Sequence, residues 1–364
     1  MKVVDVTATA HLVPTSLPHI AKPQRPMGVV VVRVETDANI TGYGMAPGNR
    51  LRQPIRELIN TDLADQLKGQ NPLETERLWK QLLAGFSRFG SAGLVSTSLS
   101  AIDIALWDIK GKAYGQPVHR LLGGANDSAP AYATFGFFDY DREGLAFMAK
   151  ELVGQGFDKM KMVVGSGNAQ DLDEDVRRIA AVRDAVGSDV RLMIDANLLF
   201  DYQRALALAK RAEGFNITWF EEPVVANDVN LLCDLRRATS IPIAAGQFEG
   251  TKTRHREFVQ HGAVDFLHAN VFYVGGYTEA LKVAHLAQTY NLPYASAGGW
   301  PHHNMQLIAG IGGWGVEVHM STWVAGEAIF VDAPVPDGGR ITISDDPGIG
   351  LTYNEDALKE YLEA

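Results

Sequence analysis

Eight short apolar runs, spread over the last two-thirds of the chain, constrain its fold more than any other feature. The runs contain mainly aliphatic or aromatic side chains, and from the second run onward successive runs begin 23 to 31 residues apart. That distance accommodates one strand, one helix and two short loops. The runs are 129–134, 159–164, 190–197, 218–223, 241–247, 264–271, 292–297 and 315–320. Eight such units are what a closed parallel barrel requires, so the pattern predicts an α/β fold of the TIM-barrel type.

A doubly wound open sheet is the alternative fold for a chain of alternating strands and helices. Such sheets usually carry a glycine-rich phosphate-binding turn after their first strand. The first run here ends in Ala133-Thr134-Phe135-Gly136, which is not a turn of that kind. The barrel is therefore the favoured prediction.

The chain before the barrel has a different pattern, which predicts a small α+β domain. Val-rich β-patterns occupy 1–10 and 29–36, and helical periodicity starts near Ile55. Residues 94–114 place apolar side chains at helical spacing and stop before Gly115, which predicts a well-packed helix. The expected parts are an α+β domain over 1–125, the barrel over 126–330, and a segment over 331–364 that ends in a short helix at 356–362 and returns to the first domain.

Charge and cysteine content narrow the classes of partner and compartment. The chain has 33 Lys and Arg against 43 Asp and Glu, and the resulting net charge of −10 repels nucleic acid and anionic membrane surfaces. Cys233 is the only cysteine, so no internal disulfide points to an oxidising compartment. The sequence shows neither a signal peptide nor an apolar stretch of membrane-spanning length. We therefore expect a cytoplasmic protein without a nucleic-acid or membrane partner.

Polar residues at the ends of three consecutive runs predict a metal site. Barrel enzymes place their functional groups at the carboxyl ends of the strands. Asp195, Glu221 and Gln247 follow one another at equal intervals of 26 residues, which brings them to equivalent places on adjacent strands. Their oxygens suit a hard divalent cation, for which Mg²⁺ is the natural choice. Carboxylates that merely capped helices or paired with Lys and Arg would not share one interval.

Two lysines on the second run are candidates for catalysis. Lys159 and Lys161 are two residues apart, so a strand points both side chains to the same side. A solvent-facing pair is the alternative interpretation. Met160, Met162 and Val163 complete a strand that we expect to be surrounded, however, and inward-facing lysines are costly without carboxylates or a metal site nearby.

These motifs together resemble the enolase superfamily, specifically its mandelate racemase subgroup. The resemblance rests on Lys159-Met160-Lys161, Asp195-Ala196-Asn197, Glu221-Glu222-Pro223 and the helical segment 98–111, and it covers nearly the whole chain. It implies a modified (β/α)₇β barrel with an N-terminal α+β capping domain. It also implies an essential Mg²⁺ and abstraction of the proton α to a substrate carboxylate, by a Lys or His base. Family members are commonly symmetric homo-oligomers.

The resemblance also implies roles for individual residues. Lys161 matches the base, and Lys159 would lie nearer the substrate carboxylate. Asn197 would donate a hydrogen bond to the substrate, and Glu317 on the last run would polarise the substrate carboxylate. A base of this kind must be neutral part of the time, and a neighbouring positive charge and a metal ion both favour the neutral amine.

Three positions depart from the subgroup's pattern. Gln247 stands where a third metal carboxylate is usual, and Glu249, two residues further on, is a competing ligand. Asn270 and Ala297 replace the Asp and His of the subgroup's catalytic dyad, which leaves Asn270 as a substrate-binding candidate and argues against two-base racemisation.

The loop after the seventh run is the expected source of a replacement acid. The sequence Gly-Gly-Trp-Pro-His-His-Asn covers 298–304, and we expect it to lie over the strand ends. His302 is the predicted general acid, slightly ahead of His303, which is then a substrate-binding candidate. His268 and His319 are expected to be core or supporting histidines, with no role assigned to either.

One base and one acid suffice for a dehydratase that removes water from a sugar acid, and this is the predicted function. A cycloisomerase or a racemase or epimerase acting on a sugar-acid lactone or anhydro sugar acid is the alternative. A non-catalytic member of the fold is a third possibility. The capping-domain loops around 15–25 and 46–50 carry Arg25, Asn49 and Arg50, which favours a polyhydroxylated acid as substrate over an aromatic one.

Overall fold

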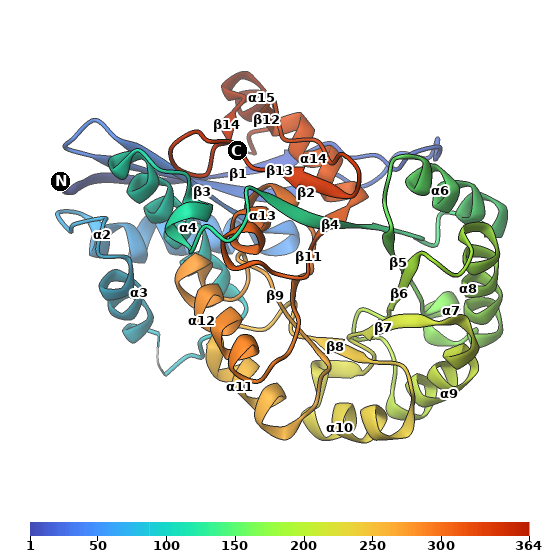
Figure 1. Cartoon of the computed structure of the whole chain (residues 1–364). Helices are drawn as coiled ribbons and strands as arrows, with labels where there is room; N and C mark the ends of the chain where they lie inside the picture. The colour runs from blue at the N-terminus through green and yellow to red at the C-terminus, as the bar shows by residue number, and fades with distance from the viewer. Residues whose placement is uncertain (87, 364) are drawn as a thin grey trace.

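The computed structural model describes residues 1–86 and 88–363. The centre of its larger domain is a closed barrel of eight parallel strands (Figure 1). Neighbouring strands pair in chain order, and β11 pairs with β4 to close the ring. The strands are β4 (Ser128–Phe135), β5 (Lys159–Val163), β6 (Arg191–Asp195), β7 (Ile217–Glu221), β8 (Ile243–Ala245), β9 (Phe266–Ala269), β10 (Tyr294–Ser296) and β11 (Gly315–His319). Each lies within one of the eight predicted runs or overlaps it, so the barrel prediction is confirmed.

Helices connect the strands and surround the barrel. They are α6 (Arg142–Gly154), α8 (Leu172–Val186), α9 (Tyr202–Ala212), α10 (Val229–Ala238), α11 (Thr251–His261), α12 (Gly276–Thr289) and α13 (Pro301–Ile311), with a short α7 (Ser166–Ala169) before α8. Aspartates begin four of them, since Asp141, Asp171, Asp201 and Asp228 each accept a hydrogen bond from a backbone N–H in the first turn. Each cap fixes the residue at which its helix begins, and therefore where the loop after the preceding strand ends.

The capping domain consists of an antiparallel sheet and helices on one of its faces. The sheet contains β1 (Val3–Val13), β2 (Met27–Thr36) and β3 (Thr41–Pro47); the helices are α1 (Arg52–Leu58), α2 (Ala64–Leu67), α3 (Thr75–Ala84), α4 (Leu94–Tyr114) and α5 (Val118–Leu121). Helix α4 has the bounds that the sequence predicts. A Cβ on Gly44 would overlap the backbone oxygen of Ala101, so a glycine there lets β3 lie directly on this helix.

Helix α4 also joins the capping domain to the barrel. Buried Asp103 accepts hydrogen bonds from the backbone N–H of Thr278 at 2.9 Å and from its hydroxyl, at the start of α12. Trp107 Nε1 donates to the same hydroxyl at 2.9 Å. The long helix therefore fixes the capping domain against the outer helices of the barrel.

The C-terminal segment returns to the capping domain (Figure 1). Helix α14 (Met320–Ile329) follows the last barrel strand, and the chain after it forms β12 (Phe330–Val331), β13 (Arg340–Thr342), β14 (Thr352–Tyr353) and α15 (Glu355–Glu360). Near its end, Leu12 N donates to Tyr361 O, and Glu363 N donates to Ala10 O, both at 2.9 Å. None of the helices within 1–86 and 88–363 is both long and apolar enough to cross a membrane.

Aromatic side chains fill the interior of the barrel below the site. Tyr132 and Trp219 meet edge to face with ring centroids 5.5 Å apart, and Trp314 lies 4.7 Å from Trp219. Met193, Ala244 and Ala295 complete this buried cluster. The barrel interior is therefore packed with aromatic and aliphatic side chains at one end. The polar side chains lie toward the other end, where the strands have their carboxyl ends.

Candidate active site

Lys161 is the centre of a buried ionic cluster inside the barrel. Its Nζ lies 2.9 Å from Asp195 Oδ2, 2.7 Å from Glu221 Oε1 and 2.9 Å from Glu317 Oε1. These four side chains come from β5, β6, β7 and β11, and all are buried. The three N–H donors of the ammonium therefore face three carboxyl groups, so each donor has a partner. The three carboxylates together carry more negative charge than the one ammonium neutralises.

Backbone and aromatic donors orient the two carboxylates that the sequence assigns to a metal. Asp195 and Glu221 occupy registered positions on β6 and β7. Asp195 Oδ1 accepts from the backbone N–H of Asn197 at 2.8 Å, and Glu221 Oε2 accepts from Trp219 Nε1 at 2.9 Å. His268 Nδ1 lies 3.7 Å from Glu221 Oε1. Each carboxylate is thereby held with one oxygen toward the cluster.

The cluster shifts the pKa of every member. Burial raises the pKa of Asp195 to about 7, against the opposing charge of Lys161. Burial acts on Glu221 in the same direction, but Lys161 and His268 more than offset it and lower the pKa of Glu221 to about 2. For Lys161, the three carboxylates outweigh burial and raise its pKa well above the ordinary value. In this arrangement Lys161 is an ammonium ion.

Gln247 presents a third oxygen on the neighbouring strand. It follows β8, its backbone N–H donates to Glu222 Oε1 at 3.2 Å, and its side chain is buried. In the part of the chain that the structure describes, Gln247 Oε1 is buried without a hydrogen-bond partner. A buried amide oxygen in this state is expected to have a ligand that the protein itself does not supply.

Glu249 does not compete for that position, because other groups hold its carboxylate. Glu249 Oε1 accepts from Asn227 Nδ2 at 3.1 Å, and Glu249 Oε2 pairs with Arg254 Nε at 3.3 Å. Among residues 1–86 and 88–363, no three His, Cys, Asp or Glu side chains form a metal-binding group by themselves. The donor set that fits Mg²⁺ is instead two carboxylates, Asp195 and Glu221, with the amide oxygen of Gln247.

Lys159 lies away from this cluster, contrary to the prediction that it sits nearer the substrate carboxylate. It is the first residue of β5 and is registered with Arg191, the first residue of β6. Its Nζ pairs with Asp158 Oδ1 at 3.1 Å and lies 5.8 Å from the ring centroid of Trp314. The two lysines do share the inner side of the strand, but two residues amount to roughly 6–7 Å along it. Lys159 therefore belongs to the opposite end of the barrel.

His302 and His303 also lie outside the cluster, so the position of His302 does not support its predicted role as general acid. Both are buried in the first turn of α13. The ring of His302 stacks on Trp323 at 4.9 Å, and the ring of His303 meets Phe272 at 4.9 Å. Burial lowers the pKa of each histidine to about 3. Trp300, in the left-handed region with a φ of 55°, turns the chain so that both rings enter the apolar layer behind β10.

The remaining predicted residues divide into a member of the cluster, a loop anchor and an exposed side chain. Glu317 Oε1 accepts from the hydroxyl of Thr134 at 2.5 Å, in addition to its ion pair with Lys161. Asn270 Nδ2 donates to Ala297 O at 2.6 Å, and its Oδ1 accepts from a backbone N–H, so Asn270 holds the loop after β10 and not a substrate. Asn197 is exposed beyond the end of β6.

His319 and Tyr273 are two functional candidates that the sequence analysis missed. His319 is the last residue of β11, and its ring centroid lies 4.9 Å from that of Phe137. Tyr273 follows β9 beside Gly298, and burial raises the pKa of its hydroxyl. The spacing of Glu317 and His319 was the available signal for the histidine, because residues two apart on a strand share a side.

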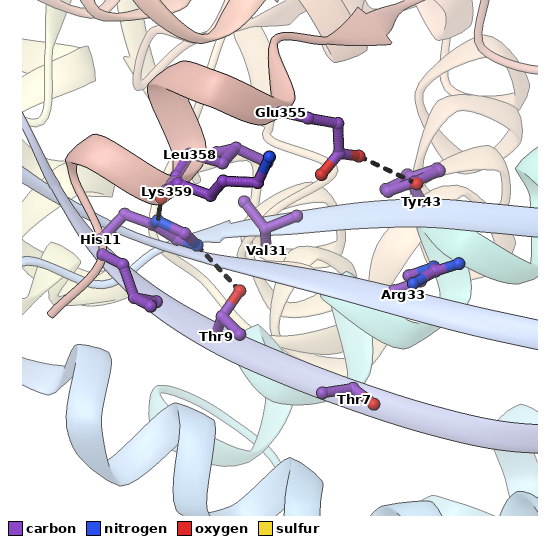
Figure 2. Close-up of a pocket in the computed structure, with 10 residues that line it drawn as sticks. Thr7, Thr9, His11, Val31, Arg33, Tyr43, Glu355, Leu358 and Lys359 are labelled. Carbon is purple, nitrogen blue, oxygen red and sulfur yellow. Dashed lines mark hydrogen bonds between the residues drawn. The ribbon is translucent and has the colours of Figure 1, made fainter. Parts of the chain in front are cut away.

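A separate cavity of about 240 Å³ lies on the capping domain, between the sheet and α15 (Figure 2). Its lining residues include His11, whose Nε2 is 2.8 Å from Thr9 Oγ1 and whose Nδ1 is 2.9 Å from Leu358 O. Tyr43 donates to Glu355 at 3.2 Å across the same cavity. Both ring nitrogens of His11 thus have partners, and Nδ1 attaches the C-terminal segment through Leu358. None of the predicted catalytic residues lines this cavity.

Comparisons with known proteins agree with this arrangement. Residues 144–357 match the family described as enolase C-terminal domain-like, and residues 2–123 match the mandelate racemase/muconate lactonizing enzyme N-terminal domain. The chain belongs to the enolase superfamily.

Relatives within the superfamily carry names of sugar-acid enzymes. An arabinonate dehydratase of Saccharolobus solfataricus is 30% identical, with 93% of this chain and 91% of the relative covered. A D-galactarolactone cycloisomerase of Agrobacterium fabrum is 33% identical, with 91% and 90% covered. A racemase from Streptomyces coelicolor A3(2), solved with bound magnesium, superposes with a TM-score of 0.91 at 26% identity and covers 99% of this chain and 100% of its own.

Proposed function

We propose that this member of the enolase superfamily is a Mg²⁺-dependent lyase that removes the α-proton of a sugar acid and then eliminates a β-hydroxyl as water. The observation that carries the proposal is the cluster of Asp195, Glu221, Glu317 and Lys161 at the carboxyl ends of the barrel strands, with a partnerless Gln247 oxygen beside it. The named dehydratase among its relatives supports the same reaction class.

Asp195, Glu221 and Gln247 would hold the metal ion. When bound, Mg²⁺ supplies positive charge that stabilises the negative charge developing on the substrate carboxylate. The magnesium-bound relative supports this choice of cation. Because Gln247 brings no charge, the three donors carry two negative charges, and the bound ion keeps more of its own positive field than three carboxylates would leave it.

Lys161 and Glu317 act on the same carboxylate end of the substrate. A proton next to a carboxylate is weakly acidic because its removal places a second negative charge on the same group. The ammonium of Lys161 stabilises that charge through a low-dielectric, buried site. The sequence predicts Lys161 as the base, but that role would require the ammonium to lose its proton while three carboxylates contact it.

A cycloisomerase is the second candidate, favoured by the 33% identical relative that is named as one. It shares the first proton transfer and differs in the leaving group, which stays tethered when a lactone or cyclic ether opens. Racemisation by the subgroup's standard dyad is not favoured, because Asn270 and Ala297 replace its members and Asn270 is engaged by the β10 loop.

The test is turnover of a sugar-acid panel in the presence of Mg²⁺. The panel contains arabinonate and D-galactarolactone, which are named for the two relatives, and further aldonic and aldaric acids and their lactones. A 2-keto-3-deoxy product with release of water identifies the dehydratase, whereas ring opening without water release identifies the cycloisomerase. Dialysis against a chelator is expected to abolish either activity, and Mg²⁺ is expected to restore it.

We further propose that the protein acts in the cytoplasm as a homo-oligomer. The single buried cysteine, Cys233, supports a reducing compartment. Symmetric assembly is supported by the resemblance to the superfamily, whose members are commonly symmetric homo-oligomers. Light scattering on the purified chain tests the second point, and a monomer at micromolar concentration would contradict it.

A further inference from the structure

We propose that His319 is the catalytic residue that accepts the α-proton of the substrate. This inference rests on the proposed function and adds to it the group that moves the proton. The need for such a group follows from the site itself, since His302 lies behind β10 and the N–H groups of Lys161 are engaged by three carboxylates.

The position of His319 on β11 places it at the mouth of the barrel. Glu317 points inward, because its carboxylate contacts Lys161 and the hydroxyl of Thr134. His319 comes two residues later on the same strand and therefore shares that inner side, one step nearer the carboxyl end. It is registered with Thr134 on β4, the strand that lies between β11 and Lys161 on β5. His319 thus lies on the inner side of the barrel wall, at the carboxyl end of the strand that carries Glu317.

The ring of His319 has an unused nitrogen. Within the residues that the structure describes, Nδ1 of His319 is buried without a hydrogen-bond partner. Burial lowers the pKa of this histidine, and neighbouring Lys161 acts in the same direction while Glu317 opposes it. A neutral imidazole beside this ionic cluster can accept a proton.

The chain around His319 holds the ring in place. Its backbone oxygen accepts from the hydroxyl of Thr322 at 3.0 Å, and that hydroxyl also accepts from Trp300 N at 2.9 Å. A Cβ on Gly299, which has a φ of 74°, would come within 3.2 Å of His319 Cβ and closer still to Thr322. The loop after β10 can therefore pass this corner only with a glycine at that position.

A buried arginine holds the aromatic partner of the ring. Phe137 packs against His319 with an interplanar angle of 51°, and it lies in the loop after β4. Arg178 on α8 donates to the backbone oxygens of Gly136 and Phe137 at 3.0 Å and of Tyr140 at 2.7 Å. Arg178 therefore fixes the backbone of this loop, and its hydrogen bonds in the described structure do not involve the ionic cluster.

The capping domain covers the same corner of the barrel. Thr15 donates its hydroxyl to Ser321 O at 2.9 Å, two residues after His319. Tyr140, from the loop that carries Phe137, donates to Pro18 O at 2.6 Å. The loop that joins β1 to β2 therefore contacts the chain on both sides of the His319–Phe137 pair, and a substrate enclosed by this loop would lie next to the imidazole.

The proposed step balances without a further reactant. The α C–H bond of the substrate breaks, the proton forms an N–H bond on His319, and the electron pair remains on the α-carbon and its carboxylate. That pair then forms the C=C bond as the β C–O bond breaks, and the proton on His319 passes to the departing oxygen. A free hydroxyl leaves as water, whereas the ring oxygen of a cyclic ether becomes a tethered hydroxyl and that of a lactone becomes part of a tethered carboxyl group.

The experiment compares His319→Asn and His319→Gln with the wild-type enzyme and with His261→Asn, which removes an exposed histidine at the end of α11. Each protein is incubated in D₂O with Mg²⁺ and the sugar-acid panel, and NMR follows deuterium at the α-carbon and product. In both His319 variants we expect the rates of α-proton exchange and of product formation to fall together by at least about 10²-fold. This is the lower end of the range for a positioned acid–base group. His261→Asn is expected to match the wild type. Exchange at the wild-type rate in either folded His319 variant would overturn the proposal.

A second measurement does not depend on turnover, so it separates failure of this inference from failure of the proposed function. The Cε1–H resonance of His319, assigned by its loss in His319→Gln, is followed by NMR while Mg²⁺ and malonate are added to the wild-type protein. A shift of that resonance that requires both additions is expected. An unchanged resonance in a sample that calorimetry shows to bind malonate, or no malonate binding at all, overturns the placement of His319 at the substrate. Inactivity of the wild type on the panel would count against the proposed function alone.

Discussion

The two halves of the barrel mouth differ in how their side chains are held. On β6, β7 and β8, Asp195, Glu221 and Gln247 stand on the strands or shortly after them. A backbone N–H donates to the carboxylate of Asp195, and the backbone N–H of Gln247 donates to Glu222. After β10, the chain that borders the site runs in a loop whose course depends on a glycine and on contacts with other elements, as for Gly299 and Trp300 against Thr322 of α14. Strand-borne groups can be located from spacing, whereas loop-borne groups depend on packing that the local sequence does not specify.

The largest expected difference is between two lysines on one strand. Lys161→Ala removes the ammonium that contacts three buried carboxylates, so we expect turnover to fall at least about 10²–10⁴-fold. The metal-free protein is expected to lose about 3–5 kcal/mol of unfolding free energy, the usual cost of leaving a buried charge unpaired. Lys159→Ala should change turnover less than about threefold. Steady-state kinetics and urea denaturation measure both effects.

An equal loss of turnover in Lys159→Ala would contradict the separation of the two lysines. Metal titration provides the control, since Lys161→Ala leaves Asp195, Glu221 and Gln247 in place. Calorimetry should therefore still detect Mg²⁺ binding in this variant, with an affinity at least equal to that of the wild type.

A second expected difference concerns how the free energy of unfolding depends on pH through His302, a buried histidine of α13. The pKa of His302 is about 3 in the folded protein and about 6.5 in the unfolded chain. The unfolded state therefore binds an additional proton below about pH 6.5, and stability is lost as the pH falls from there toward about 3. At pH 5 this amounts to about 2 kcal/mol for one such histidine.

His302→Phe removes that titration and keeps a ring against Trp323. We expect the variant to lose about 2 kcal/mol less unfolding free energy than the wild type between pH 7 and pH 5, as measured by urea denaturation at both values. Its turnover at pH 7 should stay within about threefold of the wild type. A turnover loss comparable with that of His319→Asn would return the acid role to His302.

The smallest expected effect distinguishes the third metal ligand. Gln247→Glu adds a charge at an oxygen that already points into the site, so Mg²⁺ affinity measured by calorimetry is expected to rise about tenfold. Glu249→Gln should leave the affinity within about twofold, because Arg254 and Asn227 hold that carboxylate away from the cluster. The reverse ranking would assign the third ligand to Glu249.

Much of the fold could be predicted because it follows from local periodicity. The eight apolar runs became the eight strands, and residues 94–114 became α4. The site was predictable where a residue type and a strand interval together specify a position, as for Asp195 and Glu221. Lys159 was misplaced because the period of a strand gives the side on which a residue lies and not its depth along the barrel axis.

The surroundings of His302 and Glu249 could not be predicted for a different reason. The direction of the loop after β10 depends on the left-handed backbone of Trp300 and on apolar partners such as Trp323, which lies on α14. The engagement of Glu249 depends on Arg254, one helix turn later, and on Asn227 from the preceding βα loop. Such contacts arise from the closed barrel and have no signature in the neighbouring sequence.

The most direct test of the account is deuterium exchange at the α-carbon of a sugar acid, followed by NMR in D₂O with the wild-type protein. We expect at least one member of the panel to exchange its α-proton when Mg²⁺ is present, and exchange to stop with a chelator or in Asp195→Asn. Exchange that continues at the same rate without the metal, or its absence from every sugar acid in the presence of Mg²⁺, would contradict metal-assisted proton abstraction at this site.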